Sequence, residues 1–393
     1  MVYQAKPILS AATKHLSAIF TEKAYWSLLF VGIAPLTLFS SVLVNAEGPC
    51  RRAVKLVQRI EQSEGRLGTA ERDLYKEAIE LCPEMPEIRY NFAQYLSAQD
   101  EHDQAQEEFR KAIEIENKVE FLLGLARSLL TENKNSEAKL QYEKVIEKDK
   151  LNPSALQGLA IISERTGDRD RAISQFSKAI AVEPKSAEPH FNLGVLYEKK
   201  GMNDEALFMY QKAISLSNEK HLDALFRAGL LYLNQSKSLA AIKNLERAAH
   251  LDSEDSRYPR ALGVAYQRAG KLQKAELAFR KALALDVSDR VTKVNLAKVL
   301  LQTNKPAKII ELYEDTVVDI DKTPLSSDEL YVKAIAQWKV GNPTAAEQLL
   351  MTAHNTNPSN LEVIEALISL FSELGKREQR EHFETLSLKL STE

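Results

Sequence analysis

The sequence predicts an all-α chain in which about ten helical hairpins form an α-solenoid behind an N-terminal membrane segment. Three observations predict this class. From about residue 86 onward, the sequence repeats itself at intervals close to 34 residues. Glycine and proline number only 14 and 13 in 393 residues, fewer than a sheet protein with many turns would need. Residues 24–46 carry no charge and are mostly apolar.

The N-terminal region begins with a leader, residues 1–23, and continues into the apolar run at residues 24–46. This run has 23 residues, and a helix needs roughly 20 apolar residues to cross the hydrocarbon core of a bilayer. Val44 and Ala46 stand at the −3 and −1 positions of a possible signal-peptidase site. Two alternatives stay open: the segment is removed after Ala46, or it is retained as a transmembrane anchor.

Each repeat combines two helices whose apolar residues recur at three- and four-residue intervals. Each second helix has a small residue near its start. These small residues lie 33 to 35 positions apart: Ala105, Ala138, Ala172, Ala206, Ala241 and Ala275. Four positions later the sequence has aromatic residues that are expected to fill the space between hairpins, among them Phe176, Tyr210 and Phe279. Glycines are expected to mark the turns inside the hairpins, at Gly167, Gly201 and Gly270.

The clearest copy, residues 189–216, reads PHFNLGVLYEKKGMNDEALFMYQKAISL. A period of about 34 residues with this pattern resembles the tetratricopeptide repeat family. The resemblance implies a superhelical array over residues 86–390, with an irregular loop near residues 319–329. Residues 47–85 are expected to form a divergent capping hairpin, because the ends of such arrays are atypical.

The resemblance also implies that the first helices line a concave surface where ligands lie. One slot of successive first helices holds Tyr90, Leu123, Gln157, Phe191, Phe226, Arg260, Val294 and Tyr331. The slot one helical turn later holds Gln94, Arg127, Ile161, Val195, Leu230, Val264, Lys298 and Ile335. From these slots we predict an apolar strip through Ile161, Phe191, Val195, Phe226, Leu230 and Val264. Its polar border is predicted to consist of Asn192, Arg227, Arg257 and Arg260.

We expect this strip to bind a protein or peptide partner. Phe191 and Phe226 are the predicted exposed anchors, since aromatic residues dominate binding hot spots. Arg227 and Arg260 are expected to orient an acidic stretch of the partner through charge-assisted hydrogen bonds. The alternative is that the strip only packs neighbouring first helices against each other.

The chain has two cysteines, Cys50 and Cys82. Cys50 precedes the first predicted helix and Cys82 ends the second, so an antiparallel hairpin brings them within the roughly 4.4–6.8 Å Cα separation of a disulfide. We therefore expect a disulfide, with two unrelated buried thiols as the alternative. Because disulfides persist in oxidising compartments, the pair favours a body outside the cytoplasm, as in a periplasm.

Composition and motifs argue against several classes of function. The net charge of −3 and the pI near 6.3 lack the basic surplus of a nucleic-acid binder. No phosphate loop, GxSxG or HExxH motif occurs, and the cysteines form no CxxC pair. We therefore expect no catalytic residues, no metal, no cofactor and no small-molecule substrate.

The sequence thus predicts a membrane-anchored or exported adaptor or assembly factor of a bacterial-type cell envelope, which binds its partner in the groove. Two alternatives stay open. The chain is a structural scaffold subunit of a membrane complex, or it regulates a membrane-bound enzyme. A repeat fold by itself does not choose among these functions.

Overall fold

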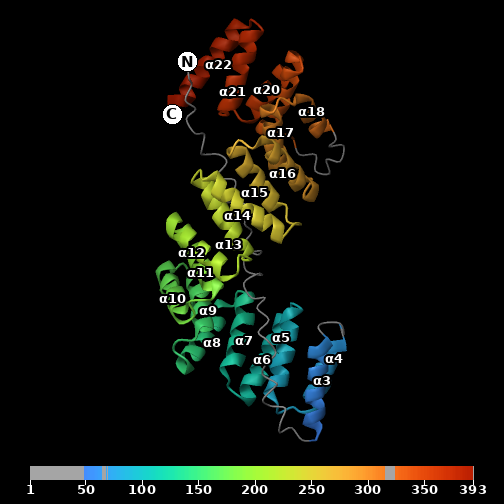
Figure 1. Cartoon of the computed structure of the whole chain (residues 1–393), viewed down its shortest axis with the longest axis vertical. Helices are drawn as coiled ribbons and strands as arrows, with labels where there is room; N and C mark the ends of the chain where they lie inside the picture. Colours follow the sequence, from blue (N-terminus) through green and yellow to red (C-terminus); the bar gives the residue numbers. More distant parts are fainter. Residues whose placement is uncertain (1–47, 64–67, 69, 315–323, 393) are drawn as a thin grey trace. The chain divides into compact units, whose positions relative to one another are not determined.

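The computed structural model describes residues 48–63, 68, 70–314 and 324–392. Within these ranges the chain forms twenty α-helices and no strand, so ten hairpins follow one another as the repeat pattern predicts (Figure 1). The chain divides into two compact units, unit 1 up to Glu219 and unit 2 from Lys220. Each unit is described by itself.

Unit 1 contains the predicted capping hairpin and four repeats. The capping hairpin consists of α3 (Pro49–Ser63) and α4 (Ala70–Leu81). The repeats consist of α5 (Pro86–Ala98), α6 (His102–Ile115), α7 (Val119–Thr131), α8 (Asn135–Lys148), α9 (Pro153–Arg165), α10 (Arg169–Val182), α11 (Ala187–Lys199) and α12 (Asn203–Leu216).

Unit 2 contains five further hairpins. Its helices are α13 (Leu222–Asn234), α14 (Ser238–Leu251), α15 (Arg257–Arg268), α16 (Leu272–Leu285), α17 (Arg290–Gln302), α18 (Pro306–Glu314), α19 (Ser327–Lys339), α20 (Pro343–Thr356), α21 (Leu361–Glu373) and α22 (Arg377–Thr392). The sequence did not predict the division into units. The loop before unit 2 places Asn218 and Glu219 in the left-handed region, with φ values of 51° and 65°.

The hairpin turns follow the predicted glycine signals. Gly167, Gly201 and Gly270 have φ values of 87°, 76° and 71°. A Cβ atom is strained in this left-handed region, so glycine ends one helix and allows the chain to reverse into the next. The second-helix rings of Phe176, Tyr210 and Phe279 are fully buried, as predicted.

The first helices form the inner side of each unit. Consecutive first helices contact each other. The contacting pairs include α5 with α7, α7 with α9, α13 with α15, and α15 with α17. In the described chain, no consecutive pair of second helices makes contacts of similar extent. We call the surface of α5, α7, α9 and α11 the inner face of unit 1, and that of α13, α15, α17, α19 and α21 the inner face of unit 2.

The irregular loop predicted near residues 319–329 ends earlier in the structure than the sequence predicted. Helix α19 already begins at Ser327, and residues 319–323 lie outside the described residues. Ser326 caps the helix, because its hydroxyl accepts the Glu329 backbone N–H while the Glu329 carboxylate accepts the Ser326 backbone N–H. This capping box starts the helix three residues earlier than predicted.

The predicted membrane segment, residues 24–46, lies outside the described residues, as does the leader before it. In the parts of the chain that the structure describes, every helix is too short or too polar to cross a bilayer. The membrane segment therefore stays a prediction.

Candidate binding surface

The ten predicted partner-binding residues all lie on first helices, four in unit 1 and six in unit 2. In unit 1 they are Ile161 on α9 and Phe191, Asn192 and Val195 on α11. In unit 2 they are Phe226, Arg227 and Leu230 on α13 and Arg257, Arg260 and Val264 on α15. The strip is therefore divided between the two units.

The two predicted aromatic anchors are buried, which corrects the expectation that they are exposed. Phe191 has an exposed fraction of 3% and Phe226 one of 6%. The Phe191 ring lies 5.7 Å from the ring of Tyr210 on the second helix of its own hairpin. The Phe226 ring lies edge-on to the Tyr258 ring, at a centroid distance of 5.2 Å. Both rings pack helices together, because each fills the space beside a neighbouring helix.

The arginines of α15 are also engaged inside unit 2. The Arg257 guanidinium donates to the Asp255 carboxylate at 2.7 Å and lies 5.8 Å from the centre of the Phe226 ring. Arg260 donates from Nη1 to the Asp289 carboxylate at 2.9 Å, and both side chains are largely buried. The Asp289 carboxylate also caps α17. Arg260 therefore already has a carboxylate partner, which argues against its predicted role, beside Arg227, in orienting an acidic stretch of a partner.

A different cation stands on the inner face of unit 1. Arg127 on α7 is the one basic residue among the eight slot positions of α5, α7, α9 and α11. Its Nε donates to the Leu123 carbonyl at 3.3 Å, and the described residues place no carboxylate within ion-pair distance of it. The half-buried guanidinium is therefore a positive charge without an acidic partner on this face.

The surroundings of Arg127 are polar but uncharged. The Gln94 side-chain amide donates to the Tyr90 hydroxyl at 2.9 Å on the neighbouring first helix. Burial raises the pKa of the Tyr90 phenol, and the nearby positive charge of Arg127 opposes that rise. Arg127 and this pair therefore form a small cluster of hydrogen-bonding groups on the inner face of unit 1.

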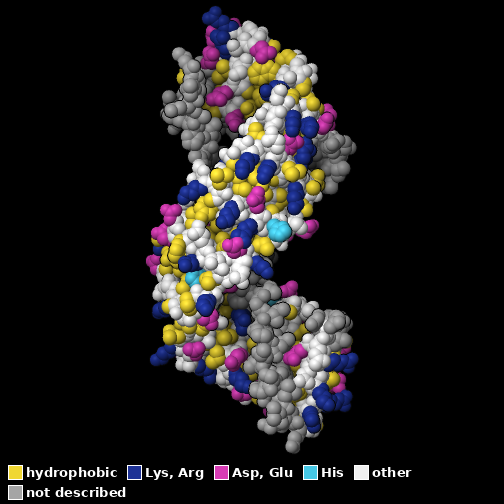
Figure 2. Space-filling model, viewed as in Figure 1, with side chains coloured by type: hydrophobic (Ala, Val, Ile, Leu, Met, Phe, Trp, Pro, Cys, Tyr) yellow, Lys and Arg dark blue, Asp and Glu magenta, His cyan; other side chains and the backbone are white. Residues whose placement is uncertain are grey.

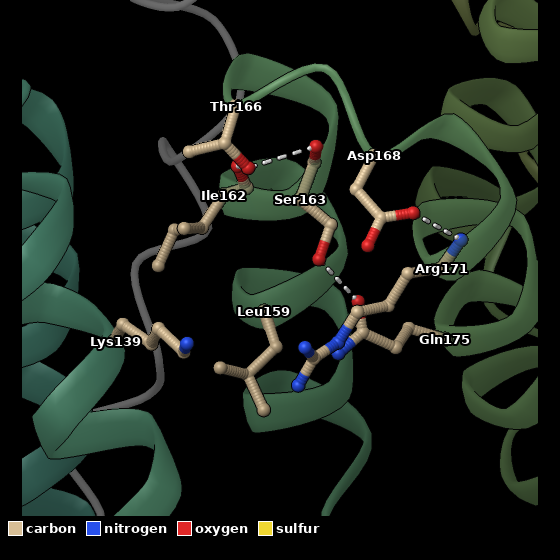
Figure 3. A pocket seen from close by; sticks show the side chains of 8 residues that line it. All are labelled: Lys139, Leu159, Ile162, Ser163, Thr166, Asp168, Arg171 and Gln175. Carbon is tan, nitrogen blue, oxygen red and sulfur yellow. Dashed lines mark hydrogen bonds between the residues drawn. The ribbon is translucent and has the colours of Figure 1, made fainter.

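A pocket lies between α8 and the α9–α10 hairpin, on the second-helix side of unit 1 (Figure 3). We call it the junction pocket; its volume open to water-sized molecules is about 90 Å³. Its lining residues are Lys139, Leu159, Ile162, Ser163, Thr166, Asp168, Arg171 and Gln175. Figure 3 shows Leu159 near the centre, with the Lys139 amine and the Arg171 guanidinium on opposite sides of it.

The junction pocket exists because one repeat lacks a bulky side chain. Ser163 is the eleventh residue of its repeat, counted from Pro153. Leucine or tyrosine stands at this position in six other repeats, as Leu96, Leu129, Tyr197, Tyr232, Tyr266 and Leu300. The Ser163 hydroxyl instead donates to the Gln175 side-chain oxygen at 2.9 Å, and both residues are buried. The sequence reasoning missed this pocket, although the misfit at Ser163 was visible in the aligned repeats.

The two cysteines form the predicted disulfide. Cys50 and Cys82 are bonded, with their Cα atoms 4.8 Å apart. The bond joins the first turn of α3 to the residue after α4, so it closes the capping hairpin at its open end. In the described residues, no group of histidine, cysteine and acidic side chains could hold a metal ion. Basic and acidic side chains are interspersed on the visible surface of both units (Figure 2).

Comparison with curated proteins finds a relative that is similar in part. The mitochondrial import receptor subunit TOM70 of Saccharomyces cerevisiae is 34% identical over 116 residues. These residues make up 27% of this chain and 19% of the receptor, so the chain spans about a fifth of the length of the relatives it matches.

Solved structures with a similar arrangement of helices include tetratricopeptide repeat proteins. The C-terminal part of such a protein from Cytophaga hutchinsonii is 19% identical, with a TM-score of 0.49 over 62% of this chain and 99% of that one. PilF of Pseudomonas aeruginosa is 20% identical, with a TM-score of 0.44 over 54% of this chain and 95% of that one.

Family comparison agrees with the hairpin architecture. Residues 86–118, 187–220 and 226–289 match families described as tetratricopeptide repeats, and residues 165–201 match one described as TPR repeat. The matches at residues 86–118, 187–220 and 226–289 follow hairpins, whereas the match at residues 165–201 covers α10 and α11 of two successive hairpins. Taken with the ten consecutive helical hairpins, these matches show that the chain belongs to the tetratricopeptide repeat family.

Proposed function

We propose that this protein is an adaptor that binds an extended, acidic segment of a partner protein on the inner face of unit 1. The fold is that of a protein-interaction module, and no enzymatic family is indicated. The partial match to a subunit named as an import receptor supports a role in binding proteins.

The observation that carries this proposal is the unpaired charge of Arg127. Three cations on the inner face of unit 2 each have a carboxylate partner: Arg257, Arg260 and Lys298. Arg127 has none within the described residues, and Tyr90 and Gln94 beside it offer further polar contacts. An acidic side chain of a partner supplies the missing counter-charge. Hydrogen bonds between a guanidinium and a carboxylate are stronger than hydrogen bonds between neutral groups.

We further propose that the adaptor acts at a cell envelope, tethered or exported by residues 24–46, with its body outside the cytoplasm. The Cys50–Cys82 disulfide supports this placement, because disulfides persist in oxidising compartments. A reporter that is active only after export, fused behind Glu393, is expected to be active. An inactive export reporter together with an active cytoplasmic reporter would reverse the topology.

Site-specific photo-crosslinking in intact cells tests the binding face. A photoreactive phenylalanine analogue replaces Gln157, which lies on α9 of the inner face, or Lys144, which is exposed on the second helix α8. We expect one crosslinked partner from position 157 and none from position 144. Arg127→Gln in the same chain is expected to reduce the crosslink several-fold, since the acidic segment loses its cation.

The conservative variant Arg127→Lys serves as the control, because it keeps the charge and restores part of the crosslink if charge is what matters. A crosslink from position 144 alone would move the binding face to the second helices. A crosslink from position 157 that Arg127→Gln leaves unchanged would contradict the role of the acidic segment.

The alternative of a scaffold subunit is favoured by exposed apolar residues on second helices. In unit 1 these include Leu140 on α8, exposed by 52%, and Phe208 on α12, exposed by 54%. A scaffold that uses this side should co-purify with its complex at fixed stoichiometry after mild detergent extraction, whereas an adaptor should be mostly free of partners.

A further inference from the structure

We propose that the junction pocket of unit 1 is a second binding site, which takes the carboxyl-terminal aliphatic residue of a partner chain. The site is separate from the inner face, because its lining comes from α8, α9, α10 and the turn before α10. It therefore goes beyond the proposed adaptor function, and either proposal can fail without the other.

The pocket has an apolar centre between two positive charges. Leu159 and Ile162 form its buried apolar part. Among the described residues, the Lys139 amine has only Glu143 as an ion-pair partner, at 3.7 Å on its own helix. The Arg171 guanidinium makes no hydrogen bond or ion pair within the described residues, while its backbone N–H donates to Asp168. Both charged groups lie beside Leu159 in Figure 3.

Gln175 adds a neutral donor to this arrangement. Its side-chain oxygen accepts the Ser163 hydroxyl, which turns the amide nitrogen away from Ser163. Gln175 and Arg171 both line the pocket (Figure 3). Besides the Asp168 carboxylate, which caps α10 by accepting the Arg171 backbone N–H, the pocket thus offers three donors around one apolar surface: an amide N–H, a guanidinium and an amine.

This chemistry selects the end of a chain over its interior. A ligand must place a carboxylate within a few bond lengths of an aliphatic group, since the cations flank Leu159 directly. A carboxyl-terminal leucine carries both groups on one Cα atom. The side chain is expected to cover Leu159 and Ile162, and the carboxylate to accept from Arg171, Lys139 or both.

Other hairpin junctions are closed where this one is open. The residues equivalent to Lys139 and Asp168 bond across three other junctions: Gln106 with Lys134 at 3.2 Å, Glu276 with Lys305 at 2.7 Å, and Glu347 with Lys376 at 2.6 Å. Lys139 and Asp168 have complementary charges but form no such ion pair in the structure. Together with the missing bulk at Ser163, this leaves the junction accessible.

The test uses N-acetyl-leucine as the probe, added to the full chain labelled at leucine and isoleucine methyl groups. We expect the NMR signals of the Leu159 and Ile162 methyl groups to shift and to saturate. N-acetyl-leucinamide lacks the carboxylate and N-acetyl-glycine lacks the side chain, so each is expected to bind at least about tenfold more weakly.

Two variants separate shape from charge. Ser163→Leu is expected to abolish the shifts by filling the pocket. The variant should fold normally, because the preceding hairpin combines Leu129 and Gln141 at the positions equivalent to Ser163 and Gln175. Lys139→Gln with Arg171→Gln keeps the pocket open and is expected to weaken binding several-fold. Lys144→Gln with Lys178→Gln, on the same two second helices but outside the pocket, is the matched control and should bind as the unmodified chain does.

The proposal is overturned if the methyl signals do not shift at saturating probe. It is equally overturned if N-acetyl-leucinamide binds as tightly as N-acetyl-leucine, or if a folded Ser163→Leu chain still binds the probe. Arg127→Gln should leave the titration unchanged, so a failure here is distinguishable from a failure of the inner-face site.

Discussion

Pairs of one small and one large side chain hold the two helices of each hairpin together. A Cβ atom added at Gly194 would lie 2.8 Å from ring carbons of Tyr210, and one added at Gly263 would lie 2.6 Å from the ring of Phe279. Real Cβ atoms do not approach other carbons so closely, so the ring occupies the space that the glycine leaves. The small–aromatic pattern of the sequence is therefore a set of direct contacts inside hairpins.

Phe191 illustrates the difference between a packing residue and a binding residue. We expect Phe191→Ala to destabilise unit 1 by about 3–5 kcal/mol, because it removes a buried ring and leaves a cavity beside Tyr210. The midpoint of urea unfolding measures this change. Phe208→Ala in the same hairpin is the control, and it should cost less than about 1 kcal/mol because Phe208 is exposed by 54%. Equal midpoints for the two variants would contradict the packing role.

At the scale of elements, the capping hairpin depends on its disulfide. Cys50 and Cys82 are 32 positions apart, and the chain-entropy model assigns roughly 3–4 kcal/mol to closing such a loop. We expect Cys50→Ser with Cys82→Ser to destabilise α3 by about that amount. Amide hydrogen exchange at Val54 and Val57, which are buried on α3, measures the loss.

Reduction of the unmodified chain is the control for this prediction, since it opens the same loop without changing any other atom. Protection of Val54 and Val57 that survives in both samples would show that packing on α4 alone holds α3 in place.

Helix α19 is stabilised by an acidic residue whose contribution depends on pH. Burial alone would raise the pKa of Glu329, but hydrogen bonds from Arg290 and Ser326 outweigh burial and lower it. The carboxylate is buried and accepts from Arg290 Nε at 3.1 Å. A carboxylate with a lowered folded-state pKa stabilises the fold above its unfolded-state pKa, about 4.3, and this contribution is lost as the pH falls through the folded-state value.

We therefore expect Glu329→Gln to lower the stability of unit 2 at pH 7 by about 1.5–3 kcal/mol, the usual range for hydrogen bonds to charged groups. The difference from the unmodified chain should shrink as the pH falls from the unfolded-state pKa of about 4.3 through the lower folded-state pKa, where the native carboxylate becomes protonated. Urea unfolding across this pH range measures it. Glu365→Gln, at an exposed site on α21, should leave the pH profile unchanged. A pH-independent effect of Glu329→Gln would rule out the ionic contribution.

At the scale of the whole molecule, stability is distributed along a row of hairpins that contact mainly their neighbours. Helix α18 interrupts this regularity in unit 2. Its nine described residues include two buried ones, Ile309 and Tyr313, whereas the fourteen residues of α16 include five. A helix with little buried area opens at low cost in free energy.

We expect hydrogen exchange to be faster in α18 than in α16 and α20, which are the second helices of the preceding and the following hairpin. Mass spectrometry of peptides from the exchanged full chain measures this, with α16 as the internal reference. Equal protection across the three helices would show that α18 is held by contacts beyond those of its own side chains.

The sequence by itself determined the helices, the hairpins and the disulfide. These features depend on spacings within about one repeat, such as the interval between Ala206 and Tyr210 or the antiparallel pairing that brings Cys50 to Cys82. The inner position of the first helices also followed, through the resemblance to tetratricopeptide repeats. The start of α19 was misplaced because the Ser326–Glu329 capping box went unrecognised.

Only the tertiary structure decided which of these residues are available to a ligand. Phe191 and Phe226 occupy predicted binding slots yet are buried, because neighbouring helices supply the rings of Tyr210 and Tyr258 beside them. Arg260 is neutralised by Asp289, a residue of the following repeat. Burial and charge pairing depend on contacts with other helices, in the same hairpin for Phe191 and in the following repeat for Phe226 and Arg260, whereas a periodic pattern describes one helix at a time.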